Sequence, residues 1–250
     1  VCQAVFLEGG LSRDGRLRPP KLGLLDYMLR DYEPDTHRDI VFIPVGINYD
    51  RTLEDRSLLR KLAPETGKRS WWFVMRTTVA FIIRNLTQMV LQRWHRFGYA
   101  CVNFGSPISA ADYCRHHGVR FGQLPRPERF AAISTLSQTL MAAVAEVVPV
   151  LPLSLVSTIF LEDIRAEWDI PSIDQRFRQL SADLQARGAP VFEISHSTRT
   201  QLVADAVNHL HLRHMVAAVN GRYRAQIEEA SLLAYYANAI AHWWPEKAID

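Results

Sequence analysis

Cysteine is scarce in this chain, and the cysteines that occur do not form obvious pairs. The 250 residues include three cysteines, at positions 2, 101 and 114, and no two of them have C-x-x-C spacing. An odd number of unpaired thiols suits a reducing cytosol and argues against a disulfide-linked scaffold. The formal net charge is only +3, so charge alone does not indicate a nucleic acid partner. A hydrophobic share of 48% and a charged share of 22% are ordinary for a folded globular chain.

Acidic residues are absent from a long central stretch. None lies between Glu65 and Asp112, and this stretch carries six cations: Lys68, Arg69, Arg76, Arg84, Arg93 and Arg96. Apolar side chains recur at helical spacing over residues 70–97, with tryptophans near both ends, which predicts one or two amphipathic helices. Such helices can lie in a lipid headgroup layer with their arginines at anionic phosphates. A helix that covers a sheet and leaves its arginines in water would give the same pattern.

A short apolar run near the start of the chain ends in a carboxylate and two glycines. Residues 4–7 predict a buried strand of a mostly parallel sheet. Glu8 follows, and Gly9 and Gly10 let the backbone turn sharply and approach a ligand closely. This order of residue types is typical of a strand that leads into a phosphate-binding loop.

The next dozen residues supply groups that bind phosphate oxygens. Ser12 offers a hydroxyl, Arg13 and Arg16 offer planar guanidinium forks, and Lys21 offers a mobile point charge. Two prolines, at positions 19 and 20, stiffen the end of the loop. A glycine-rich loop whose arginines are simply solvated is the alternative interpretation.

This N-terminal segment resembles the third conserved block of the glycerolipid acyltransferases, most closely the membrane-associated bacterial glycerol-3-phosphate O-acyltransferase family. That block reads approximately F-x-E-G-G-R-S-R-T-G-R-L-x-P-P-K-x-G, and this chain departs from it at Leu11 and Asp14. The resemblance implies that Glu8 hydrogen-bonds the glycerol part of the substrate or holds the loop. It also implies that Ser12 and Arg13 hold the phosphate, with the cations at positions 16 and 21 in support. Leu11 leaves one cation of the family pattern without a counterpart.

Three further segments resemble the same family. Residues 39–50 predict a buried strand with Pro44 inside it, and a proline is tolerated there only at an edge or a bulge. The family's fourth block lines the active-site cleft, so the resemblance makes Pro44 and Tyr49 candidate pocket residues, although an ordinary core strand would look the same. Residues 99–108 resemble a V-x-F-G-x-P-I strand, and residues 235–242 resemble the family's Y-Y-x-N-x-I-A-H tail.

The histidine–aspartate pair that this chemistry needs is missing from the sequence. A glycerol hydroxyl is a poor nucleophile at neutral pH and needs a general base, usually a histidine oriented by a carboxylate. The family supplies the pair as H-x-x-x-x-D upstream of the glycine-rich block, and none of the nine histidines in this chain has an aspartate five positions later. We therefore expect no catalytic residue here, and we interpret the chain as the C-terminal part of a longer enzyme, inactive by itself.

The resemblance also implies substrates and a location. It implies an enzyme of phospholipid synthesis that transfers a fatty acyl group from acyl-CoA or acyl carrier protein to the first hydroxyl of glycerol 3-phosphate. Dihydroxyacetone phosphate is a second acceptor that the sequence does not distinguish. We expect a peripheral protein on the cytoplasmic face of the inner membrane, at an anionic surface, with no cofactor and no nucleic acid partner. We also expect no metal, because the spacing of His209, His211 and His214 does not place three imidazoles on one helix face.

The expected fold class is α/β, in two parts. Residues 1–124 would form the C-terminal half of an acyltransferase α/β domain, with a mostly parallel sheet and covering helices. Residues 125–250 would form a mainly helical region after a proline-containing linker at 125–128. We predict helices, one of them with Ser172 as its N-cap, and a hairpin around an Asn-Gly turn. The helices span residues 129–148, 154–163, 172–187, 198–210 and 231–244, and the hairpin spans 215–226.

Helices followed by a hairpin could also form a small winged-helix-like module. That arrangement defines a second function class, a non-catalytic basic domain that binds nucleic acid or a protein partner. Arg222 and Arg224 on the hairpin matter only to this second class, whereas the phosphate-binding loop matters only to the enzyme.

Overall fold

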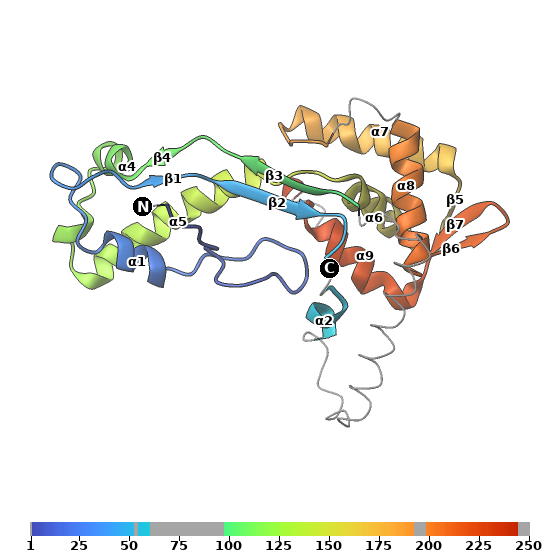
Figure 1. Cartoon of the computed structure of the whole chain (residues 1–250), viewed down its shortest axis with the longest axis horizontal. Helices are drawn as coiled ribbons and strands as arrows, with labels where there is room; N and C mark the ends of the chain where they lie inside the picture. Colours follow the sequence, from blue (N-terminus) through green and yellow to red (C-terminus); the bar gives the residue numbers. More distant parts are fainter. Residues whose placement is uncertain (1, 53–54, 61–97, 193–198, 245–250) are drawn as a thin grey trace, which may run out of the picture.

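The computed structural model describes residues 2–52, 55–60, 98–192 and 199–244 (Figure 1). The described part is elongated. Strands and a long helix run along its length, and a cluster of helices with a small sheet forms one end. This mixed architecture confirms the α/β class. The basic helices predicted over 70–97 lie outside the described residues.

Four strands form an antiparallel ribbon in the N-terminal part. Their bounds are β1 (Val41–Phe42), β2 (Val45–Tyr49), β3 (Ala100–Phe104) and β4 (Ile108–Ser109). β1 pairs with β4, and β2 pairs with β3, with Val45 opposite Phe104. Every pairing between named strands in the described ranges is antiparallel, so the expectation of a mostly parallel sheet is wrong for these strands. An apolar run indicates burial, but it does not determine which neighbour the strand pairs with.

The strand predicted over residues 39–50 is interrupted at Pro44. β1 ends at Phe42 and β2 begins at Val45, because proline has no N–H to donate to a ladder. The backbone N–H of Gly105 donates to the Pro44 carbonyl oxygen at 2.8 Å. A Cβ on Gly105 would lie only 3.1 Å from the Pro44 Cβ, so this close crossing favours glycine. The single strand expected over residues 39–50, with an edge or a bulge at Pro44, is thus two strands.

The prediction of a strand over residues 4–7 is wrong. These residues form no strand, and Val5 and Phe6 are 47% and 71% exposed. Strand formation requires a partner ladder, and no described segment offers one to this stretch. The loop that follows nevertheless has an ordered structure of its own.

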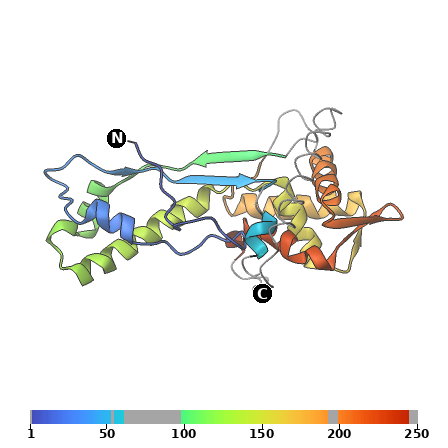
Figure 2. The same cartoon turned by 60° about the horizontal axis from the view of Figure 1, so that its bottom comes forward.

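One hydrophobic core lies at the N-terminal end of the molecule. It joins α1 (Gly23–Leu29), α4 (Ala110–His117), the 3₁₀ turn Phe121–Gln123 and the first half of α5 (Arg126–Val147). Leu29, Phe121 and Leu136 are completely buried in it. α5 then continues beneath β2 and β3, which lie side by side above it (Figure 2). Among the described helices, α5 is the one with the length and apolar composition to cross a membrane.

The linker predicted at residues 125–128 is instead the beginning of α5. Pro125 is the N-cap of the helix, and Pro127 lies in its first turn. Proline is well tolerated there because the first N–H groups of a helix have no intrahelical partner. Because the first half of α5 packs against α1, residues on both sides of position 125 share one core. The domain boundary at 124/125 stays a prediction.

A second, larger core occupies the C-terminal end. It is built around α6 (Pro152–Glu162), which packs against α7 (Ile170–Ala186), α8 (Arg199–Leu212) and α9 (Ala230–Asn238). A three-stranded sheet with the order β5-β7-β6 lies beside these helices. Its strands are β5 (Glu167–Trp168), β6 (Val216–Val219) and β7 (Arg222–Ala225). The described residues also include α2 (Asp55–Arg60) and the 3₁₀ turns Ile227–Glu229 and Ala241–Trp243.

Local signals predicted most of these C-terminal elements. Asn220 and Gly221 both have positive φ, 49° and 79°, as a tight two-residue hairpin turn requires, so the predicted hairpin is confirmed. The N-cap of α7 is Asp169 rather than Ser172, because the Asp169 carboxylate accepts the Ser172 N–H at 2.8 Å. The last predicted helix is shorter than expected, since α9 ends at Asn238.

Candidate functional site

Residues 7–21 form a loop whose two ends are joined by hydrogen bonds. The backbone N–H of Lys21 donates to the Leu7 carbonyl at 2.8 Å, and the Arg18 N–H donates to the Glu8 carboxylate at 2.8 Å. Gly9 has φ +70°, and a Cβ there would lie 2.6 Å from the Lys21 Cδ. Glu8 therefore holds the base of the loop closed, one of the two roles that the family resemblance implies for it.

The carboxylate of Asp14 organises the middle of the loop. Its Oδ1 atom accepts the Arg16 N–H at 3.1 Å and lies 3.0 Å from the Ser12 hydroxyl. The same hydroxyl lies 2.8 Å from the Arg16 carbonyl, so its single proton has two acceptors within the loop. Binding a phosphate through a Ser12 O–H donor would require that proton to turn away from both.

The tip of the loop rests on α9. The Asn238 side-chain amide donates to the Asp14 carbonyl at 2.8 Å. Gly15 has φ +86°, and a Cβ at this position would lie 1.9 Å from the Tyr235 carbonyl oxygen. The loop is therefore held at its base by its own backbone and at its tip by a helix more than 200 residues later. Figure 1 shows the corresponding trace before α1 extending towards α9.

The loop presents positive charge to solvent. Arg13, Arg18 and Lys21 are exposed, whereas Ser12 and Arg16 are partly covered. No ion pair joins Arg13 or Lys21 to an acidic residue within the described part of the chain. Burial raises the pKa of the Glu8 carboxyl, while the Arg18 N–H and the Arg18 charge act in the opposite direction. Seven of the eight predicted site residues thus come together in one basic loop.

Pro44, the eighth predicted site residue, is in a different environment. It is buried at the break between β1 and β2, and it packs against Gly105. Tyr49 is 46% exposed on the outer side of the ribbon. A pocket role for Pro44 or Tyr49 stays a prediction.

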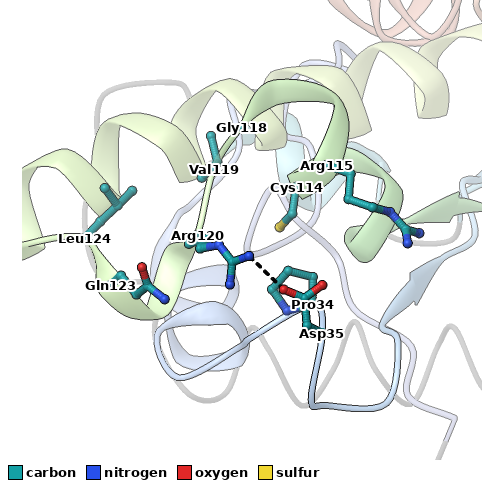
Figure 3. A pocket seen from close by; sticks show the side chains of 9 residues that line it. All are labelled: Pro34, Asp35, Cys114, Arg115, Gly118, Val119, Arg120, Gln123 and Leu124. Carbon is teal, nitrogen blue, oxygen red and sulfur yellow. Dashed lines mark hydrogen bonds and ion pairs between the residues drawn. The ribbon is translucent and has the colours of Figure 1, made fainter.

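A hollow of about 510 Å³ lies at the N-terminal end of the molecule, away from the loop. Its lining residues come from the segment after α1, from α4 and from the turn before α5 (Figure 3): Pro34, Asp35, Cys114, Arg115, Gly118, Val119, Arg120, Gln123 and Leu124. Arg120 is the cation that faces Asp35 in this hollow, with an ion pair of 2.7 Å. No predicted site residue lines it, and its charges are already paired internally.

Two of the described histidines, His209 and His242, are partly buried. Burial lowers the pKa of His209 to about 4, with the Arg213 charge acting in the same direction, so this imidazole is neutral at pH 7. The His242 Nε2 atom lies 3.0 Å from the Ala145 carbonyl in the last turn of α5. No three His, Cys, Asp or Glu side chains are grouped for metal binding in the residues that the structure describes.

Two residues that shape the loop, Asp14 within it and Asn238 on α9, were not among the predicted site residues. Asp14 departs from the family pattern, yet it is the residue that orders the loop. Asn238 belongs to the Y-Y-x-N-x-I-A-H segment, whose position in the sequence gave no indication of a contact with residue 14. The joint resemblance of both segments to one family was the signal that they act together.

Comparison with known proteins defines the class of this chain. The sequence model of the family described as "Glycerol-3-phosphate acyltransferase C-terminal region" matches residues 84–249, which is more than half of the chain. The chain therefore belongs to this family.

Individual proteins that are similar to this chain are named glycerol-3-phosphate acyltransferase. A glycerol-3-phosphate acyltransferase of Pseudomonas aeruginosa (strain LESB58) is 38% identical over 112 residues, which are 45% of this chain and 12% of that protein. A glycerol-3-phosphate acyltransferase of Pseudomonas putida (strain GB-1) is 28% identical over 255 aligned residues, covering 95% of this chain and 28% of that protein. The chain thus spans less than a third of the length of these relatives.

Proposed function

We propose that this chain is the acceptor-binding and C-terminal part of a glycerol-3-phosphate acyltransferase. The observation that carries the proposal is the basic loop from Glu8 to Lys21, closed at its base and supported at its tip. Two exposed cations of the loop, Arg13 and Lys21, have no acidic partner in the described residues, so they are available to a phosphate. Membership of the family supplies the reaction class.

Each loop residue has a role in this proposal. The Arg13 guanidinium binds two phosphate oxygens as a fork, and Lys21 adds a mobile charge at the base of the loop. Gly9 and Gly10 leave the backbone open for the ligand to approach. Glu8 holds the loop closed through the Arg18 N–H.

Ser12 and Arg16 act closer to the middle of the loop. The Ser12 hydroxyl turns from its acceptors in the loop to the bound phosphate, and Arg16 supports the site with its charge. Asp14 carries a negative charge near this position, which disfavours an anion. We therefore assign the phosphate mainly to the exposed cations on the outer side of the loop.

The reaction needs a base that this chain does not supply. The base removes the proton of the first glycerol hydroxyl as the oxygen attacks the thioester carbonyl of acyl-CoA or acyl carrier protein. The tetrahedral intermediate then expels the thiolate, which takes up a proton, and an ester remains. His209 is neutral but lies on α8 in the C-terminal core, and it has no carboxylate in the family spacing. We propose that the histidine–aspartate pair comes from a part of the enzyme outside this sequence and that this chain alone is inactive.

A peripheral position on the cytoplasmic face of the inner membrane fits this activity, because the acyl product is a lipid precursor. The apolar composition of α5 is compatible with membrane contact, but the first half of α5 is used in the N-terminal core. The basic segment 70–97 remains the candidate for the anionic surface.

Replacing Arg13 with Ala tests the proposed acceptor site. The measurement is glycerol 3-phosphate binding by titration calorimetry, with Arg224→Ala, an exposed arginine of β7, as the matched control. A charge-assisted hydrogen bond contributes about 1.5–3 kcal/mol, so Arg13→Ala should weaken binding roughly 10- to 150-fold. Equal affinities of Arg13→Ala and Arg224→Ala would remove Arg13 from the site.

A binding module is the second candidate, favoured by the order of the C-terminal elements. Helix α6, strand β5, helices α7 and α8 and the β6–β7 hairpin follow one another, and β5 pairs with β7. This order is compatible with a winged-helix-like unit that binds nucleic acid or a protein partner. We favour the enzyme because the basic loop has no role in such a module.

A further inference from the structure

Two elements at opposite ends of the sequence meet at the tip of the basic loop. Asp14 and Gly15 form that tip, and Tyr235 and Asn238 lie on α9. The spacing of three residues puts positions 235 and 238 on the same face of the helix. Each of the two α9 residues contacts a different residue of the tip.

The contacts at the tip leave little freedom in position. The Asn238 amide donates to the Asp14 carbonyl at 2.8 Å, which fixes the peptide group between Asp14 and Gly15. Gly15 approaches the Tyr235 carbonyl so closely that any side chain at position 15 would clash with backbone. The close approach of the Gly15 backbone to the Tyr235 backbone therefore sets the distance between the loop and the helix.

The Asp14 side chain carries this constraint into the loop. The backbone carbonyl of Asp14 accepts a hydrogen bond from Asn238 on α9. The carboxylate of Asp14 accepts the Arg16 N–H and lies beside the Ser12 hydroxyl. The position of α9 is therefore linked through one residue to two of the groups assigned to the phosphate.

The adjacent residue on α9 contacts a different segment. The Tyr236 hydroxyl accepts the Thr52 N–H at 3.3 Å and donates to the buried Asp55 carboxylate. The loop tip and the segment that follows β2 therefore both contact one short stretch of α9, which fixes their positions relative to each other.

We propose that α9 positions the acceptor-binding loop, with Asn238 as the positioning residue that acts through Asp14 on Ser12 and Arg16. This inference rests on the function proposed above for the loop. It gives the C-terminal region a part in acceptor binding without any contact to the substrate.

The test separates loop position from global stability. Asn238→Asp keeps the shape of the side chain but replaces the amide donor with a carboxylate, and Asn238→Gln keeps a donor. Asn208→Asp, an exposed position on α8, is the control with the same charge change. Hydrogen exchange is measured on peptides from the loop and from the β6–β7 hairpin in the 250-residue chain, together with glycerol 3-phosphate affinity.

We expect Asn238→Asp to raise loop exchange and to weaken glycerol 3-phosphate binding about three- to tenfold, as loss of one hydrogen bond implies. The hairpin should stay unchanged, and Asn238→Gln should restore part of the effect. Loop exchange equal to that of Asn208→Asp would overturn the proposal. An equal rise in loop and hairpin would also overturn it, because Asn238 would then support the whole fold. Faster loop exchange in a chain whose wild type binds no glycerol 3-phosphate would support the positioning role and refute the proposed function.

Discussion

The carboxylate of Asp55 is buried between a cation and a phenol, and this cluster makes a strong prediction about stability. Arg213 Nη2 lies 2.5 Å from Asp55 Oδ2, and the two side chains are only 14% and 4% exposed. Arg213 also donates to the Tyr236 hydroxyl at 2.7 Å, and that hydroxyl in turn donates to Asp55. Burial raises the pKa of Tyr236 well above its ordinary value, with the Asp55 carboxylate adding to the shift, so the phenol remains a donor.

Replacing Arg213 with Met removes the cation and leaves the Asp55 carboxylate buried without its ion pair. Breaking a buried pair in this way costs about 3–5 kcal/mol of unfolding free energy. Replacing Tyr236 with Phe removes one hydrogen bond to a charged group and should cost about 1.5–3 kcal/mol. The two losses should not add, because both side chains contact the same carboxylate.

Urea unfolding of the 250-residue chain, followed by circular dichroism, measures these changes. Arg224→Met, at an exposed position, is the matched control and should lie within about 0.5 kcal/mol of wild type. Adding Asp55→Asn to Arg213→Met should recover part of the loss, because the buried charge is then gone. An Arg213→Met variant as stable as Arg224→Met would refute the argument, and so would full additivity of the Arg213 and Tyr236 changes.

Two further predictions concern the loop tip and a buried acid. Gly15→Ala should destabilise the chain by about 1–3 kcal/mol in urea unfolding, because its φ is +86° and the new Cβ would clash with α9; Gly10→Ala has open space and should change little. Burial raises the pKa of Asp50 from 3.8 to about 6, so the folded chain holds this proton more tightly than the unfolded chain. Unfolding free energy should therefore fall by about 3 kcal/mol in all as the pH rises from about 3 to about 7, with most of the fall between about 4 and about 6. The fall should be absent from Asp50→Asn, and an identical pH profile in wild type and variant would refute it.

Elements defined by local signals were predictable from the sequence. The Asn-Gly turn determined the hairpin, since both turn residues adopt positive φ. Helical periodicity located α6 and α8 to within two residues at each end. The sequence marked Pro44 as a special position in its strand because proline has no N–H, although it did not show that the strand divides there.

Elements defined by distant partners were not predictable. Residues 4–7 have the composition of a strand but no ladder partner in the described part. The direction of β2 is set by β3, more than 50 residues later, and an apolar pattern contains no information about that pairing. The start of α5 was misread because prolines at a first turn and in a linker have the same local signature.

The candidate site combines local and distant signals in the same way. The sequence predicts phosphate binding by the loop, because glycines, a hydroxyl and cations at close spacing are typical of such loops, and that role stays a proposal. The geometry of the loop could not be predicted, because Asp14 is fixed by Asn238 across 224 positions. A loop of this length without outside contacts would lose binding free energy each time it became ordered around a ligand. If the loop binds the acceptor as proposed, support from α9 removes part of that cost in advance, and this would give the tail segment a part in binding without any contact to the substrate.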